Sequence, residues 1–198
     1  ASSAPTHAGL ACRALASGLH AYVEKPFALT LADAETMAAA AAAAGRQLMV
    51  GHLLRYHDVF GELLSQSDAG VIGEVRHVTA NRLAMGRIRA TESVIHDLCP
   101  HDISLILAIM GGMPERISCT GASHVMPGNV DTLSAFLAFA GGRSAAMNTS
   151  WISPYKEHRL TVSGTGGAIV FDDTRPWAEK LTLSVSYTHL TLPTIHRV

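Results

Sequence analysis

The sequence lacks a cluster of one charge and a long hydrophobic run. Its 198 residues include 15 basic and 16 acidic side chains, with a formal net charge of −1. Without a basic cluster, nucleic acid is not an expected partner. The apolar run over residues 103–113 is interrupted by two glycines, so it is too short to span a bilayer. We therefore expect neither a nucleic-acid nor a membrane partner.

Cysteine is also scarce. Cys12, Cys99 and Cys119 are odd in number and widely spaced, which argues against a disulfide framework and a zinc knuckle. This usage fits a reducing, cytoplasmic environment. Apolar residues make up 48% of the chain and charged residues 16%, which is ample material for a packed core.

A Gly-x-Gly-x-x-Gly phosphate-binding motif is missing as well, and no strand precedes the first expected helix to carry one. The dense glycine cluster at 164–167 lies between two β-like runs and is typical of a turn. The chain begins without Met and without a basic region followed by an apolar one, so a signal peptide is not expected.

What is present in the first 70 residues alternates between helix and strand. Helices are expected over residues 6–17, from the Thr30 cap to Gly45, and over 56–70, with buried strands at 21–23 and 48–50. This rhythm predicts half of a doubly wound α/β domain.

Residues 71–184 have a different composition. One helix is expected over residues 100–110, with Pro100 in its first turn. Strands are expected over 74–83, 116–122, 132–139, 144–152, 159–163 and 168–171. This pattern predicts an α+β domain with a largely antiparallel open sheet.

Residues 185–198 stand apart. The run over 185–194, read back into codons, resembles a sequencing-library adapter, so we expect a non-native tail outside the fold. The alternative is a genuine β-hairpin, given its Val, Tyr and Thr content.

Two short motifs carry the candidate chemistry. Lys25 directly follows an apolar strand, where α/β proteins place reactive groups. Asp97 precedes His101 by four residues, so the two can share one helical face and the carboxylate can orient the imidazole. In this interpretation Lys25 polarises a substrate oxygen and His101 takes the hydroxyl proton. Asp102 caps a helix or binds substrate.

Three further motifs accompany these two: Pro5-Thr6-His7, Gly51-His52-Leu53-Leu54-Arg55 and Arg159-Leu160-Thr161-Val162-Ser163-Gly164. Together, the motifs resemble those of the glucose–fructose oxidoreductase, inositol dehydrogenase and MocA-like family. The resemblance runs from about residue 5 to 173. It implies a partial Rossmann-type domain, with the phosphate-binding loop upstream of this fragment.

The same resemblance implies NAD or NADP as cofactor, with Glu24, Lys25 and Arg55 on its nicotinamide side, and a sugar or polyol as substrate. The open sheet face would suit a homo-oligomer. Two departures blur the substrate class: family members often carry Asp where this chain has Ser104, and Gly where it has Cys99.

Two other function classes remain open. A non-catalytic scaffold could use the same fold. A metal-dependent hydrolase could use His96, Asp97 and His101, but no His-Glu-x-x-His spacing is present, and the expected metal content is none. Trp151 and Tyr155 could line a pocket, although burial in the core is the expectation.

Overall fold

The structure is a computed structural model that describes residues 2–86, 88–89, 92–185 and 188–191, with side chains described up to residue 184. The chain forms two compact units, residues 1–53 and 54–198. We describe each unit by itself.

The first unit alternates helices and strands, as expected from the sequence. Its strands pair in parallel, with Ala21 opposite Leu48 and Val23 opposite Val50. Its elements are η1 (Ala4–Thr6), α1 (His7–Ala16), β1 (Ala21–Val23), α2 (Leu31–Ala44) and β2 (Leu48–Val50), and the short helix η2 (Leu53–Tyr56) spans the division between the units.

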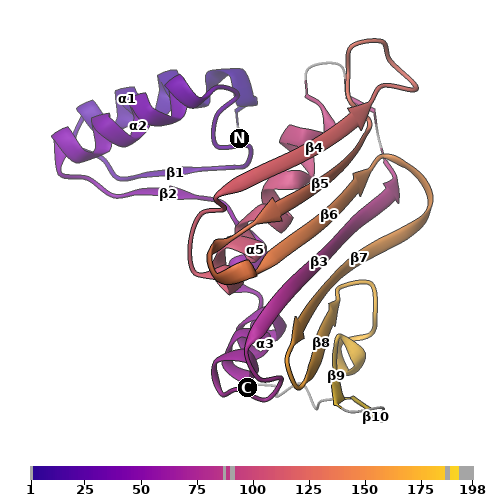
Figure 1. The fold of residues 1–198 in the computed structure, drawn as a ribbon. Helices are drawn as coiled ribbons and strands as arrows, with labels where there is room; N and C mark the ends of the chain where they lie inside the picture. Colours follow the sequence, from indigo (N-terminus) through magenta and orange to yellow (C-terminus); the bar gives the residue numbers. More distant parts are fainter. Residues whose placement is uncertain (1, 87, 90–91, 186–187, 192–198) are drawn as a thin grey trace. The chain divides into compact units, whose positions relative to one another are not determined.

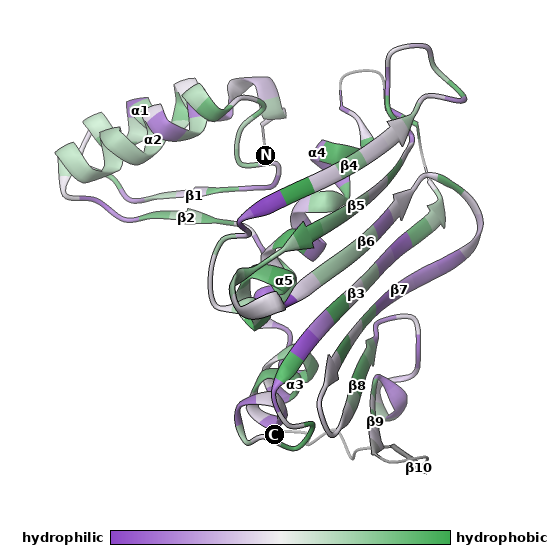
Figure 2. Ribbon diagram, in the orientation of Figure 1, coloured by the Kyte–Doolittle hydropathy of each residue, from purple (hydrophilic) through white to green (hydrophobic). Residues whose placement is uncertain are grey.

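Helix α2 begins and ends where its sequence predicts. The Thr30 hydroxyl accepts a hydrogen bond from the backbone N–H of Asp33, and Gly45 ends the helix in the left-handed conformation with φ of 59°. The run of alanines makes the C-terminal part of α2 apolar (Figure 2) and lets α1 and α2 pack closely over the two strands. The buried core here includes Leu15, Val23 and Met37.

The second unit is built on an eight-stranded sheet in the order β10-β9-β8-β7-β3-β6-β5-β4 (Figure 1). Its helices are α3 (Asp58–Asp68), α4 (Val94–Asp97), α5 (Cys99–Met110), η3 (Ala140–Gly142) and η4 (Trp177–Glu179). Its strands are β3 (Val75–Met85), β4 (Arg116–Ala122), β5 (Thr132–Ala138), β6 (Ser144–Ser150), β7 (Ile152–Gly164), β8 (Gly167–Asp172), β9 (Leu181–Val185) and β10 (Thr188–Thr191).

The sheet is largely antiparallel, as expected, but it is mixed. β3 pairs in parallel with β6, while every other neighbouring pair is antiparallel. The expectation of a single helix among these strands is incomplete, because the short helix α4 precedes α5. The sequence-based strand over 159–163 is also too short, since β7 begins at Ile152.

Alternate residues of the central strands face opposite sides of the sheet, as the striped colouring of β3 in Figure 2 shows. Val78, Leu160 and Ile106 belong to the core between the sheet and its helices. On the opposite face, a row of polar side-chain contacts crosses five strands. Hydrogen bonds join Ser134 to Asn148, Asn148 to Asn81, and Asn81 to Glu157. Arg159 pairs with Glu157 and donates a hydrogen bond to Asp172, which completes the row.

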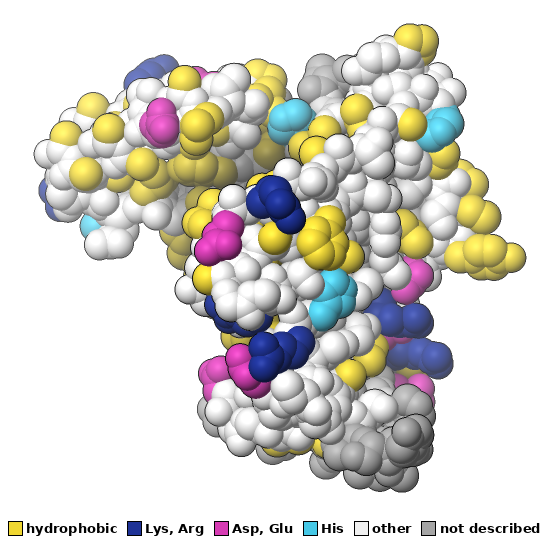
Figure 3. All heavy atoms as spheres, in the orientation of Figure 1, with side chains coloured by type: hydrophobic (Ala, Val, Ile, Leu, Met, Phe, Trp, Pro, Cys, Tyr) yellow, Lys and Arg dark blue, Asp and Glu magenta, His cyan; other side chains and the backbone are white. Residues whose placement is uncertain are grey.

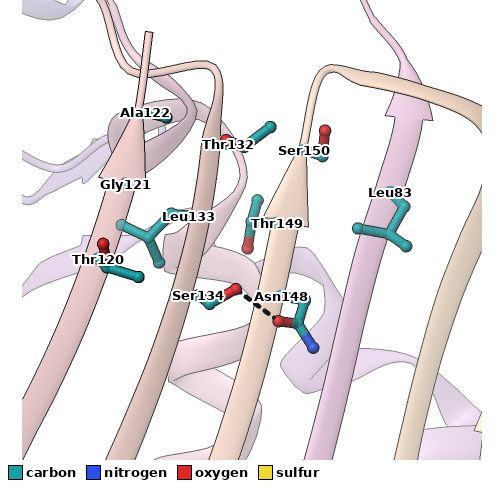
Figure 4. A pocket seen from close by; sticks show the side chains of 10 residues that line it. All are labelled: Leu83, Thr120, Gly121, Ala122, Thr132, Leu133, Ser134, Asn148, Thr149 and Ser150. Atoms are coloured by element: carbon teal, nitrogen blue, oxygen red, sulfur yellow. Dashed lines mark hydrogen bonds between the residues drawn. The ribbon is translucent and has the colours of Figure 1, made fainter.

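That face also carries a shallow hollow of about 280 Å³ at one end of β4, β5, β6 and β3 (Figure 4). Hydroxyl groups of Thr120, Thr132, Ser134 and Ser150 line it, with Asn148 beside Ser134. In Figure 3, the described basic and acidic side chains on this face of the unit are interspersed rather than gathered into patches of one sign.

The division between the units falls earlier than the expected boundary near residue 70. The reason is the apolar face of α3: Val59, Phe60 and Leu63 are fully buried in the core of the second unit. The helix over 56–70 therefore packs with the sheet that follows it.

Part of the tail expected outside the fold pairs with the sheet. β10 lies at the sheet edge and pairs with β9 over four residues, Thr188 to Thr191. Residues 186–187 and 192–198 of this segment lie outside the described residues. An edge position is where an added segment can pair with exposed backbone groups.

Candidate active site

Lys25 stands at the carboxyl end of β1, as its sequence context predicts. Because β1 and β2 are parallel, the residues that follow them, Glu24-Lys25 and Gly51-His52, lie at the same edge. The Lys25–Pro26 peptide bond is cis. The Lys25 side chain is half-buried, so it is partly accessible to solvent.

A histidine that sequence reasoning overlooked supports this turn. His7 of α1 is 6% exposed, and its Nδ1 lies 2.9 Å from the carbonyl oxygen of Pro26. The carbonyl can only accept, so Nδ1–H donates. His7 therefore ties α1 to the Glu24-Lys25-Pro26 segment. The Pro5-Thr6-His7 sequence signals a helix start, but it gives no sign of this distant partner.

Glu24 turns across the end of β2. The Tyr22 hydroxyl donates to Glu24 Oε1 at 3.3 Å. A Cβ atom added to Gly51 would lie 2.8 Å from Glu24 Oε2 and 2.7 Å from the Tyr22 hydroxyl. Glycine at position 51 therefore leaves the space that the carboxylate of Glu24 occupies.

Asp97 and His101 lie in the second unit, at the junction of two helices. Asp97 is the last residue of α4 and His101 lies in the first turn of α5. Leu98 separates the helices, so Asp97 and His101 belong to two successive helices rather than to one, although φ and ψ of Leu98 (−106° and −42°) remain right-handed helical. Asp97 is 8% exposed and accepts a hydrogen bond from the Trp151 indole at 3.2 Å.

Arg55 reaches the same helix. Its Nη1 donates to the carbonyl oxygen of Ser104 at 3.1 Å. The Ser104 hydroxyl donates to the carbonyl oxygen of His101 at 2.7 Å. The structure thus brings Arg55, Asp97 and His101 together around α4 and α5, while Glu24 and Lys25 belong to the first unit.

Asp102 does not cap a helix; its buried carboxylate pairs with Arg82. It is 3% exposed and accepts hydrogen bonds from Nε of Arg82 at 3.0 Å and from its Nη2 at 2.7 Å. Burial raises the pKa of Asp102, and the Arg82 guanidinium opposes that rise. The pair fixes α5 to β3, so the carboxylate next to His101 has a structural role.

Trp151 and Tyr155, the two aromatic residues that follow β6, differ in burial. Trp151 is 2% exposed, as expected for a core residue, but Tyr155 is 82% exposed and the core expectation is wrong for it. Both follow the same β-like run, but Trp151 donates to Asp97 of α4, whereas Tyr155 lies on β7 with its side chain exposed.

Cys99 lies between Asp97 and His101 but is not a nucleophile. Its thiol is buried, donates weakly to the Thr149 hydroxyl at 3.7 Å, and burial raises its pKa to about 11. Such a thiol stays protonated and unreactive at neutral pH. Within the described part of the chain, no three His, Cys, Asp or Glu side chains gather in a way that could hold a metal ion.

Two family models match the chain. Residues 1–52 match the oxidoreductase family model with an NAD-binding Rossmann fold, and residues 62–170 match the GFO/IDH/MocA C-terminal domain. The second match alone covers more than half of the chain.

Among curated proteins, the chain is 29% identical to UDP-N-acetylglucosamine 3-dehydrogenase of Acidithiobacillus ferrooxidans, over 79% of this chain and 49% of that protein. It is 27% identical to inositol 2-dehydrogenase of Rhizobium meliloti, over 96% of this chain and 60% of that protein. The chain thus spans about half of the curated relatives it matches.

The fold agrees with solved structures. An oxidoreductase from Magnetospirillum magnetotacticum superimposes with a TM-score of 0.82 at 31% identity, over 92% of this chain and 58% of that one. An inositol dehydrogenase homologue from Azotobacter vinelandii gives 0.88 at 22% identity, over 98% and 54%. With a Rossmann-type half unit, a mixed open sheet and both family models in the expected order, the chain belongs to the GFO/IDH/MocA family of oxidoreductases.

Proposed function

We propose that the protein is an NAD(P)-dependent oxidoreductase acting on a hydroxyl or carbonyl group of a sugar, polyol or related compound. The observation that carries the proposal is Lys25 at the carboxyl end of a parallel strand, inside the segment that matches the NAD-binding family model. The names of relatives that act on inositol and on UDP-N-acetylglucosamine support the substrate class.

The proposed roles follow from the chemistry of each side chain. The Lys25 ammonium donates to the substrate oxygen and favours the negative charge that develops there. His101 accepts the hydroxyl proton, because an imidazole can act as a general base near neutral pH. Asp97 orients the His101 imidazole, and a bound nicotinamide supplies the hydride acceptor.

The residues at the strand edge fit the nicotinamide end of such a cofactor. Nucleotides bind at the carboxyl ends of parallel strands, and Glu24, Lys25 and Gly51 occupy that edge here. We assign Glu24 to this side on the basis of the resemblance, together with Arg55. NAD and NADP both fit the proposal, because Glu24, Lys25 and Arg55 are assigned to the nicotinamide side and not to the ribose 2′ position that distinguishes the two cofactors.

The proposal includes a cytoplasmic location and a homo-oligomeric assembly. Cys12, Cys99 and Cys119 are all free thiols, which supports a reducing compartment. No helix among the described residues is long and apolar enough to cross a bilayer. The uncovered face of the large sheet supports association of identical subunits.

The direct test is an oxidation assay of the full-length protein with a panel of polyols and sugars and either NAD or NADP, followed by absorbance of the reduced nicotinamide. Changing His101 to Asn should abolish the limb of the kcat profile that rises through the imidazole titration. An unchanged rising limb, or no turnover with any hydroxyl substrate, would exclude the assigned base or the proposed activity.

A further inference from the structure

Trp151 contacts the proposed site from the sheet side. It lies between β6 and β7, is 2% exposed, and is the bulkiest of the fully buried side chains among the described residues. Its indole Nε1–H donates to Asp97 Oδ2 at 3.2 Å. A buried carboxylate keeps a defined orientation only while donors hold its oxygens, and a hydrogen bond to a charged group is stronger than one between neutral groups.

The backbone of Trp151 is fixed on both sides. Its N–H donates to the carbonyl oxygen of Asp131 at 2.9 Å, and its carbonyl accepts from the N–H of Gly86 at 2.7 Å. These contacts fix the backbone position from which the indole reaches Asp97.

Asp131 is itself firmly held. It is 1% exposed, and its carboxylate accepts from the backbone N–H groups of His124 and Val125 and from the ring of His124. Burial would raise the pKa of Asp131, but these hydrogen bonds outweigh burial and lower it. The next residue towards the N-terminus, Val130, accepts a hydrogen bond from the N–H of Val94 at the start of α4. The same loop therefore secures both Trp151 and the helix that ends in Asp97.

Gly86 provides the space for the indole. A Cβ atom added there would lie 2.8 Å from Cδ1 of Trp151, closer than real Cβ contacts, and 3.3 Å from Cγ. Any side chain at position 86 would therefore displace the ring whose N–H reaches Asp97.

We propose that Trp151 is a positioning residue of the active site: its indole N–H holds the Asp97 carboxylate in the orientation that aligns His101. The inference rests on the proposed function. Arg89 lies 3.8 Å from the other carboxylate oxygen, Oδ1, but its side chain is half exposed, so the buried indole is the more rigid of the two contacts. Trp151 touches neither substrate nor cofactor in this proposal and acts only through Asp97.

The test is a double-substitution cycle in the full-length protein. Trp151→Phe keeps an aromatic ring but removes the donor, and should lower kcat roughly ten- to a hundredfold, as loss of a hydrogen bond to a charged group does, with KM changed much less. In an Asp97→Asn background the same change should lower kcat less than about threefold, because residues that act through one another are not additive.

Two further variants keep the test decisive. Gly86→Ala should reproduce the loss of kcat by displacing the indole, and it decides the question if Trp151→Phe folds poorly. Tyr155→Phe, at an exposed aromatic residue nearby on β7, is the matched control and should leave kcat unchanged.

Near-normal kcat in Trp151→Phe would overturn the inference. If Trp151→Phe folds poorly, near-normal kcat in Gly86→Ala would do the same. The inference would also be overturned if Trp151→Phe lowered kcat by the same factor in the Asp97→Asn background as in the unmodified protein. If His101→Asn loses the rising limb of the pH profile but Trp151→Phe and Gly86→Ala keep near-normal kcat, only the role of Trp151 is wrong. If His101→Asn leaves the pH profile unchanged, the proposed function itself is wrong.

Discussion

Lys25 is the residue on which the proposed chemistry depends most. Lys25→Ala in the full-length protein should lower kcat by roughly two orders of magnitude or more, as loss of a donor to a developing oxyanion does. Cofactor affinity should change much less, because the ammonium acts on the reacting oxygen. Steady-state kinetics together with cofactor titration measures both effects.

The matched control is Lys156→Ala, which removes an exposed lysine of β7 and should leave turnover unaltered. If Lys25→Ala were as active as this control, the strand-end lysine would be an ordinary solvated side chain.

At the scale of elements, the Arg82–Asp102 pair joins β3 to α5 and thereby holds the helix that carries His101. Arg82→Met should destabilise the fold by about 3–5 kcal/mol, because it leaves a buried carboxylate without its partner. Denaturant unfolding measures the change. Arg76→Met, on the same strand, breaks the exposed Arg76–Glu74 pair and should cost less than about 1 kcal/mol.

A double variant tests the mechanism of this loss. Arg82→Met combined with Asp102→Leu removes both charges and should recover most of the stability, since apolar groups often replace a buried ion pair without net cost. Equal losses in Arg82→Met and Arg76→Met would show that the buried pair contributes no more than a surface one.

His158 of β7 lies opposite Arg82 of β3 and links stability to pH. Burial, with the nearby charges of Arg82 and Lys156, lowers its pKa to about 4. Between the ordinary histidine pKa of about 6.5 and this value, the unfolded chain binds more protons than the folded one, so stability falls as pH falls. Above that window the contribution is fully present.

The expected loss is about 1–2 kcal/mol between pH ~6.5 and pH ~4, after allowance for screening of a partly exposed group. His158→Gln should flatten this part of the pH–stability curve, measured by urea unfolding. Thr161→Val, on the same strand, changes no titratable group and should keep the slope. A slope unchanged by His158→Gln would assign the proton uptake elsewhere.

At the scale of the whole molecule, dinucleotide binding should need more than residues 1–198. This sequence contains no Gly-x-Gly-x-x-Gly loop, and backbone N–H groups of such a loop normally hold the pyrophosphate. Without them, the ordering entropy of a flexible dinucleotide is left largely uncompensated. Calorimetry should therefore detect no micromolar binding of NAD or NADP to residues 1–198, whereas the full-length protein should bind. Micromolar binding by the shorter chain would mean that the β1–β2 edge alone is sufficient.

Local signals in the sequence determined most of the elements. The elements of the first unit match their prediction closely, because they depend on interactions within a few residues. These elements are the helix between the Thr30 cap and Gly45, with its alanine run, and the strands at 21–23 and 48–50. The alternating strands of the second unit and the turn at 164–167 follow from the same local rules. The order of the motifs also carried the family resemblance, which the family models confirm.

Only the tertiary structure decided which distant groups meet. Four features each join residues from separate elements: the parallel pairing of β3 with β6, the burial of α3 in the second unit, the Arg82–Asp102 pair and the hydrogen bond from Trp151 to Asp97. The sequence gives no periodicity for such contacts, because they depend on how elements cross and pack rather than on the spacing along any one of them. For the same reason, Asp102 looked like a site residue and proved to be a structural one, while His7 and Trp151 gained partners that no local pattern predicts.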